Sequence, residues 1–155
     1  MEQKWVKSQV ILYEFLCLQF FDLIFWFDSG KIKVAVDGGA NHLPTIQCAK
    51  PDIVSGDFDS IKDELLQQYK QYDNIEMIHT PDQDETDFIK SILILQEKKV
   101  NFEFIIAFWS SAGRIDQIFS GINTLIRFHD KPVFLLYPGK SLSWILDKVI
   151  IKLHN

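Results

Sequence analysis

Several residue types that mark particular classes of protein are scarce in this 155-residue chain. Its two cysteines, Cys17 and Cys48, form neither a disulfide framework nor a CxxC metal-binding spacing, so we expect two reduced thiols. Basic residues number 16 against 21 acidic ones, and the net charge of −5 argues against a nucleic-acid-binding protein, which would carry a basic stripe. The sequence shows no repeat, linker or low-complexity segment, and its length suits one well-packed domain.

A long hydrophobic run free of acidic residues is also missing. Residues 10–27 are strongly apolar and follow two lysines, as in a signal peptide or a membrane anchor, but Glu14, Gln19 and Asp22 interrupt them. A charged residue at the centre of a membrane-spanning helix costs about 2.5–3.5 kcal/mol on insertion scales, and no small-residue cleavage site follows the run. We therefore expect a strand and a buried helix here, in a cytoplasmic protein rather than a membrane protein.

Short β-branched runs alternate with longer helical patterns along the chain. Strands are expected at residues 9–13, 33–36, 53–54, 75–80, 102–108 and 133–136, with one or two more within 143–153. Helices are expected before residue 30, after an N-cap at Ser60 to about residue 72, after an N-cap at Thr86 to about residue 98, and at 115–128. This alternation implies parallel strands joined by crossover helices. The expected fold is therefore α/β, a three-layer α/β/α, Rossmann-like domain with a mostly parallel sheet.

Acidic side chains gather in two short segments. The first acidic segment, residues 56–60, reads GDFDS, and the second, residues 80–87, reads TPDQDETD. These carboxylates would repel one another unless a cation lay between them, and hard divalent cations such as Mg²⁺ prefer oxygen ligands. In an extended stretch Asp57 and Asp59 would share one face, with Phe58 pointing away. A solvated turn ahead of a helix explains this pair equally well.

Two further segments carry groups suited to phosphate binding. Residues 37–41 read DGGAN, where the glycines let the backbone approach a ligand closely. Residues 113–117 read GRIDQ, where Arg114 offers a guanidinium to phosphate oxygens and Asp116 can orient it or reach a substrate hydroxyl. Each segment alone is more often an ordinary turn. All four segments follow predicted strands, however, and ligands of open α/β sheets bind beyond the carboxyl ends of the strands.

Together these four segments, with NTL at residues 123–125, resemble the thiamin pyrophosphokinase family in their order and spacing, from about residue 33 to residue 128. The resemblance implies transfer of pyrophosphate from ATP to the hydroxyethyl oxygen of thiamin, which gives thiamin diphosphate and AMP. It also implies a dependence on Mg²⁺, ATP as co-substrate and a homodimer. This chemistry fits the residues, because phosphoryl-type transfer relies mostly on positioning and on neutralising charge.

The resemblance also assigns roles to individual residues. The family's Mg²⁺-binding carboxylates match Asp57, Asp59 and Asp87. The positions that contact the nucleotide or its phosphates match Asp37, Gly38, Gly39, Asn41, Gln83, Asp84 and Thr86. Catalytic-site residues match Arg114 and Asp116. A carboxylate near the thiamin hydroxyl, either Asp84 or Asp116, is expected to accept its proton.

The chain also departs from the family pattern. Trp109 and residues 110–112 stand where the family has glycines, and an indole there would crowd the approach of phosphates. We expect residues 1–138 to form the ATP-binding catalytic α/β domain and residues 139–155 to begin a truncated C-terminal β domain, since the family's β-sandwich domain is largely absent. The alternatives are a non-catalytic family member that binds Mg-ATP or pairs with another subunit, and an Mg²⁺-dependent nucleotide hydrolase.

Overall fold

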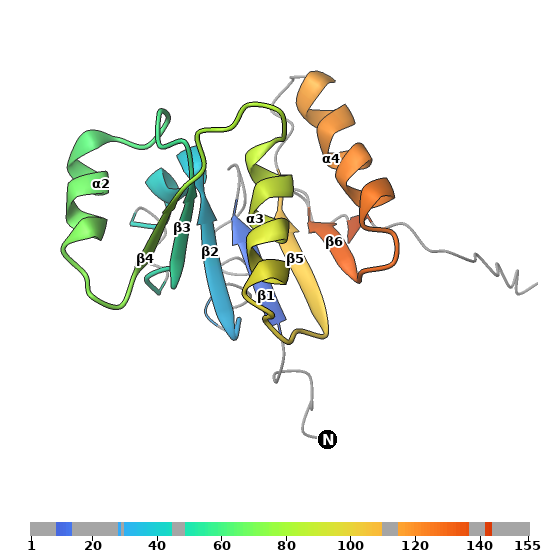
Figure 1. Cartoon of the computed structure of the whole chain (residues 1–155), viewed down its shortest axis with the longest axis horizontal. Coiled ribbons are helices and arrows are strands. Elements are labelled where there is room, and N and C mark those ends of the chain that lie inside the picture. Colours follow the sequence, from blue (N-terminus) through green and yellow to red (C-terminus); the bar gives the residue numbers. More distant parts are fainter. Residues whose placement is uncertain are drawn as a thin grey trace, which may run out of the picture.

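The computed structural model describes residues 30–44, 49–109 and 115–136, together with residue 28 and, for the backbone alone, residues 9–13 and 142–143. Within this part of the chain, seven strands form one sheet in the order β4-β3-β2-β1-β5-β6-β7 (Figure 1). The strands are β1 (Gln9–Tyr13), β2 (Ile32–Val36), β3 (Ile53–Gly56), β4 (Glu76–His79), β5 (Phe104–Phe108), β6 (Val133–Leu136) and β7 (Leu142–Ser143). All neighbouring strands pair in parallel except β6 and β7, which are antiparallel.

Helices cover both faces of this sheet. They are the 3-10 helix η1 (Asp37–His42) and the α-helices α2 (Asp63–Lys70), α3 (Asp87–Glu97) and α4 (Ile115–Arg127). The helices α3 and α4 lie in front of the sheet in Figure 1 and bury one of its faces, whereas η1 and α2 pack on the other. The expected three-layer α/β/α, mostly parallel architecture is therefore confirmed.

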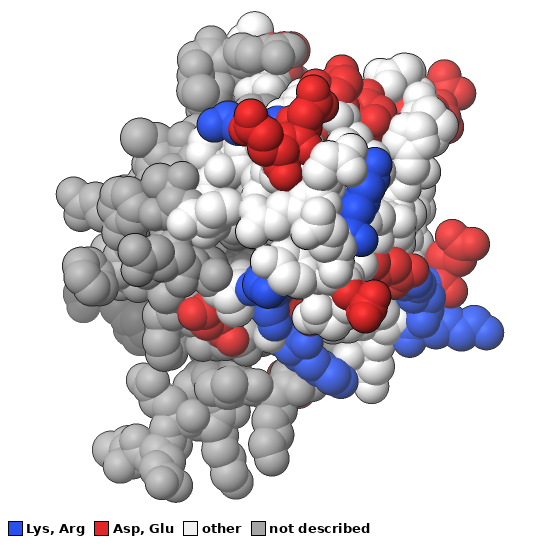
Figure 2. All heavy atoms as spheres, turned by 90° about the vertical axis from the view of Figure 1, so that its left-hand side faces the viewer, with Lys and Arg blue, Asp and Glu red and all other residues white. Residues whose placement is uncertain are grey.

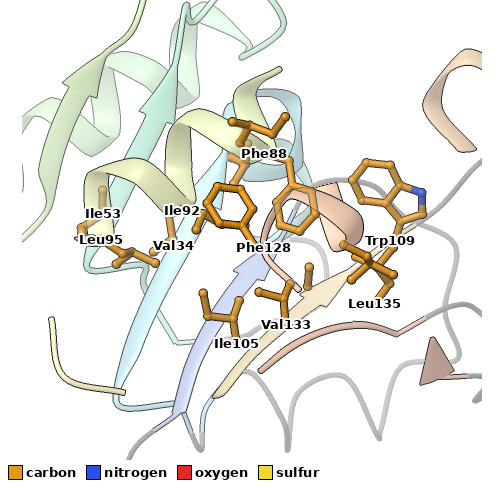
Figure 3. Close-up of a cluster of buried hydrophobic side chains, with 14 residues drawn as sticks. Val34, Ile53, Phe88, Ile92, Leu95, Ile105, Trp109, Phe128, Val133 and Leu135 are labelled. Atoms are coloured by element: carbon orange, nitrogen blue, oxygen red, sulfur yellow. The ribbon is translucent and has the colours of Figure 1, made fainter. Parts of the chain in front are cut away.

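Two apolar clusters fill the spaces between these layers. The cluster beneath α3 and α4 includes Val34, Ile105 and Trp109 (Figure 3). The cluster beneath η1 and α2 includes Ala35 and Val54. Val34 and Ala35 are consecutive in β2 and enter different clusters, because side chains alternate between the two faces of a strand. Because both faces of this parallel sheet are covered, its strands must be apolar on both sides, and the short strands of this chain are continuous apolar runs of that kind.

The two predicted helix starts have different outcomes. Thr86 caps α3 as expected, since its Oγ1 accepts a hydrogen bond from the Ile89 N–H at 3.3 Å. The prediction for Ser60 is wrong: α2 begins at Asp63, with Lys62 as N-cap and no side-chain cap. The Ser60 hydroxyl instead donates to Asp59 Oδ1 at 2.7 Å. Ser60 lies two residues before the N-cap position, so its side chain belongs to the acidic turn and not to the helix.

The remaining predicted elements differ little from those observed. The strands expected at 75–80 and 102–108 are each shorter by two residues, and β3 extends two residues beyond the expected 53–54. The helix expected before residue 30 and most of the strand region expected within 143–153 lie outside the described residues. Among the helices that are described, none is both long and apolar enough to span a bilayer.

The hydroxyl of Tyr69 fastens α2 to η1. Tyr69 is 4% exposed, and its hydroxyl donates a hydrogen bond to the carbonyl oxygen of Ala40 at 3.2 Å. Burial raises the pKa of this phenol to about 12, and the nearby Tyr72 adds to the shift. The phenol thus stays neutral across the physiological range and serves as a donor to a backbone carbonyl beside the carboxyl edge of the sheet.

We expect Tyr69→Phe to lower the free energy of unfolding by about 1 kcal/mol, because the buried Ala40 carbonyl loses its partner. Urea unfolding followed by circular dichroism measures this loss. Tyr72→Phe is the matched control, since the Tyr72 hydroxyl accepts an exposed hydrogen bond from Gln68 at 3.3 Å. Equal losses in the two variants would contradict the anchoring role of Tyr69.

Candidate functional site

A cleft of about 660 Å³ opens at the carboxyl edge of the sheet. Its walls come from the segments that follow β2, β3, β4 and β5 and from the first turns of α3 and α4. The upper edge of the molecule in Figure 2 carries a row of acidic side chains, as expected from the two acidic segments. The convergence of these loops, predicted from their position after successive strands, is confirmed for the described residues.

Asp37 enters the cleft in an unusual backbone conformation. Its φ is +40°, a value that L-residues seldom adopt, and it follows β2 directly. The neighbouring Gly56 makes room for it, because a Cβ at Gly56 would lie 2.8 Å from the Asp37 Cβ. Burial raises the pKa of the Asp37 carboxyl, and the charges of Asp87 and Asp57 add to this, while hydrogen bonds from Gly38 and Ser60 oppose it.

Asp57 and Asp59 come together through a turn rather than an extended strand. Phe58 between them has a φ of +68°, so the extended geometry expected from the sequence is wrong. The Phe58 ring stacks on His79 at a centroid distance of 5.4 Å, and the Asp59 N–H donates to Asp57 Oδ1 at 3.2 Å. One carboxylate oxygen from each of Asp37, Asp57 and Asp59 lies within 4.8 Å of the others.

The side chain of Gln83 joins the two acidic segments. Its Nε2 donates to Asp57 Oδ2 at 2.9 Å and to the Pro81 carbonyl at 3.3 Å. The hydrogen bond from Gln83 to Asp57 is the main reason why the pKa of Asp57 is lowered, followed by the hydrogen bond from the Asp59 N–H. The Asp84 N–H donates to Asp82 Oδ1 at 2.9 Å, which closes the turn of the second segment.

Most of the residues that the sequence singles out line this cleft. They are Asp37, Gly38, Asp57, Asp59, Gln83, Asp84, Thr86, Asp87 and Asp116. Gly39 is buried and Asn41 lies outside the lining: its Nδ2 donates to the Ser60 carbonyl at 2.7 Å and its Oδ1 accepts from the Lys62 N–H at 2.9 Å. Asn41 therefore holds the loop after Asp59 in place. Arg114 lies outside the described residues.

Sequence reasoning missed Lys90, which also lines the cleft. Its side chain is buried, and its Nζ lies 2.7 Å from Asp87 Oδ1. The sequence prediction for α3 rested only on its apolar positions and its capping residues, so it assigned no role to Lys90. The available signal was the spacing of three residues between Asp87 and Lys90, which makes their side chains neighbours on a helix.

Trp109 belongs to the core and also lines the cleft. Its side chain is 3% exposed, and its ring lies 5.3 Å from that of Phe88 between centroids. A Cβ added at Gly121 of α4 would lie 3.0 Å from the indole, so the helix packs closely against the ring. Figure 3 shows the indole among the core side chains. The ring packs beneath α3 and α4 and also lines the cleft, so its effect on the approach of phosphates stays a prediction.

Known proteins share this arrangement. The family model "Thiamin pyrophosphokinase, catalytic domain" matches residues 25–135. Among solved structures, thiamin pyrophosphokinase from Candida albicans superposes with a TM-score of 0.70 at 24% identity, covering 84% of this chain and 57% of that one. Thiamine pyrophosphokinase from Bacillus subtilis superposes with a TM-score of 0.66 at 21% identity, covering 84% and 60%. These structural likenesses concern the fold.

Curated relatives extend the comparison to sequence. Thiamin pyrophosphokinase 1 of Caenorhabditis elegans is 37% identical over 119 residues, which are 70% of this chain and 46% of that protein. Thiamine pyrophosphokinase 1 of Arabidopsis thaliana is 30% identical over an alignment of 134 positions that covers 75% of this chain and 50% of that protein. The chain thus spans about half the length of these relatives. With the family model matched over most of its length, the chain belongs to the thiamin pyrophosphokinase family, through that family's catalytic domain.

Proposed function

We propose that this chain supplies the Mg²⁺- and ATP-binding site for the transfer of pyrophosphate from ATP to thiamin, which gives thiamin diphosphate and AMP. The observation that carries the proposal is the meeting of Asp37, Asp57 and Asp59, whose oxygens lie within 4.8 Å of one another on the cleft. Membership of the family supports the choice of reaction, since the relatives above carry this activity in their names.

The residues present fit a hard divalent cation. Asp37 Oδ1 is buried and has no hydrogen-bond partner among the described residues, which is costly for a carboxylate oxygen unless a cation satisfies it. We assign Asp57 and Asp59 as Mg²⁺ ligands, with Asp37 beside them. Asp87, which the resemblance adds to the ligands, lines the same cleft and forms an ion pair with Lys90. Its direct ligation stays a prediction.

The chain's own groups have distinct tasks in such a transfer. Bound Mg²⁺ would neutralise charge on the phosphates. The hydroxyethyl oxygen of thiamin attacks the β-phosphorus of ATP, the bond from that phosphorus to the bridging oxygen of the α-phosphate breaks, and AMP leaves with the electron pair. Asp84 and Asp116 both line the cleft and are the candidates to accept the hydroxyl proton. The first turn of α3, capped by Thr86, offers N–H groups suited to phosphate oxygens.

We expect the purified chain, incubated with ATP, Mg²⁺ and thiamin, to form AMP and thiamin diphosphate in equal amounts. Chromatography of both products over time provides the measurement, and omission of thiamin is the control. AMP release without thiamin would identify a nucleotide hydrolase instead. Absence of turnover together with a higher melting temperature in Mg-ATP would leave a non-catalytic, nucleotide-binding role.

Asp57→Asn should reduce AMP formation about 100-fold or more, because it removes a negative charge from the proposed metal site and preserves its size. The measurement is kcat/KM as a function of Mg²⁺ concentration. Asp73→Asn is the control, since Asp73 is exposed and does not line the cleft. Near-normal turnover in Asp57→Asn would refute the metal assignment.

The homodimer is a proposal with support from α4. Its outward side exposes Ile115, Phe119, Ile122 and Ile126, by 62%, 63%, 40% and 55% of their surfaces. Their spacings of four, three and four residues make a continuous stripe, the pattern of helices that pack in pairs. A stripe of this kind is its own complement when two copies of α4 pack antiparallel about a two-fold axis. A contiguous exposed apolar row marks an interaction surface.

Phe119→Glu should shift the chain from dimer to monomer in sedimentation velocity at micromolar concentration, because it places a charge in the centre of the apolar stripe. Leu93→Glu is the matched control: Leu93 is 36% exposed on α3, outside the stripe. A monomeric wild-type chain, or a Phe119→Glu variant that remains dimeric, would contradict pairing through α4.

A further inference from the structure

A buried lysine stands on the wall of the proposed nucleotide cleft. Lys90 is 8% exposed, is the fourth residue of α3 and lines the cleft. Lysine is among the residues least often buried, and it is buried chiefly where its charge is paired. Its neighbours Ile89 and Ser91 are also buried. The burial of Lys90 therefore calls for partners inside the fold.

Three partners surround the Lys90 ammonium. Its Nζ donates to the carbonyl oxygens of Thr80 and Asp82, both at 2.8 Å, and lies 2.7 Å from Asp87 Oδ1. Two of the three N–H donors of the ammonium group make these hydrogen bonds, and the contact with Asp87 is an ion pair. These three contacts hold the Lys90 ammonium against groups of the chain, and through those groups it can shape the nucleotide cleft.

Those partners lie at both ends of the second acidic segment, residues 80–87. Lys90 holds its start through two carbonyls and its end through Asp87. Between these points lies Gln83, whose amide reaches the Asp57 carboxylate at 2.9 Å. The Thr80 N–H adds a hydrogen bond to the Gly56 carbonyl at 2.8 Å. A chain of direct contacts therefore runs from Lys90 to the carboxylates proposed to bind Mg²⁺.

The charge balance of the cleft gives the same residue a second task. Of the described residues that line the cleft, seven carry carboxylates: Asp37, Asp57, Asp59, Asp84, Glu85, Asp87 and Asp116. Lys90 is the one lysine or arginine among those lining residues. Its ammonium offsets part of the mutual repulsion in a partly buried place, where solvent screens charges less than at an open surface.

Resting on the proposed function, we propose that Lys90 is a positioning residue that fastens the second acidic segment and Asp87 to α3. It thereby gives the cleft the shape that Mg-ATP enters, without contacting the phosphates. The role differs from that of a phosphate-binding lysine in one testable respect. A positioning lysine orders the segment before any ligand arrives, whereas a phosphate-binding lysine acts only once the nucleotide is present.

Hydrogen exchange of the metal-free, nucleotide-free chain tests this difference. In Lys90→Met, a variant of similar length without the charge, we expect the amides of residues 82–86 to exchange about tenfold faster than in the wild type. Amides of β3 should keep their wild-type rates, because the core beneath is unchanged. Lys98→Met is the matched control: Lys98 ends the same helix in an exposed ion pair with Glu76 at 2.6 Å and should change neither set.

Kinetics supply the second readout where the wild-type chain forms AMP. We expect kcat/KM for Mg-ATP to fall about 100-fold in Lys90→Met, with a higher KM from the cost of ordering the segment and a lower kcat from the misplaced Asp87 and Gln83. Lys98→Met should remain within about twofold of the wild type. A wild-type chain without thiamin-dependent AMP formation would refute the proposed function but leave the exchange experiment valid.

Specific outcomes would overturn the inference. Wild-type exchange rates in Lys90→Met, together with lost ATP binding, would assign Lys90 to the phosphates instead. Equally faster exchange in residues 82–86 and in β3 would indicate a general contribution to stability. If Lys90→Met does not fold, the double variant Lys90→Met/Asp87→Asn, which leaves no unpaired charge, replaces it in the exchange experiment. The same two results would then overturn the proposal.

Discussion

Parallel pairing of β2, β3 and β4 is the constraint on which the cleft depends. The register aligns Val36 with Ser55 and Gly56 with His79, so the residues that follow these strands emerge side by side. Asp37 meets Gly56 at this edge, and the missing Cβ of the glycine allows a contact that any other side chain would prevent. Carboxylates distant in the sequence thereby become neighbours before any ligand acts on them.

Bringing these acids together creates repulsion that the surrounding groups only partly offset. Gln83 and the Asp59 N–H donate to Asp57, and the Lys90 ammonium pairs with Asp87. Asp37 keeps a buried oxygen without a hydrogen-bond partner among the described residues, and its pKa is raised. A carboxylate whose buried oxygen has no hydrogen-bond partner is poorly stabilised by the protein alone and is well suited to bind a cation.

The layer beneath the cleft gives these loops a fixed base. The hydroxyls of Ser55 in β3 and Ser91 in α3 lie 2.8 Å apart in the buried interface, and Ser91 also donates to the Asp87 carbonyl at 2.7 Å. Trp109 packs against Phe88 and the backbone of α4. Both helices that border the cleft are therefore held by close contacts with the sheet, which limits how far the acidic segments can move apart.

Local sequence patterns suffice to predict the α/β alternation, the place of both acidic segments after strands, and the Thr86 cap, because periodicity and capping act over a few residues. Other features of the cleft arise only from tertiary contacts. The left-handed turn at Phe58, the contact of the Ser60 hydroxyl with Asp59, and the three partners around Lys90 belong to folded loops that hydrophobic periodicity does not reveal. Contacts between residues about twenty positions or more apart, such as Asn41 with Lys62 and Gln83 with Asp57, follow from packing, which local patterns do not encode.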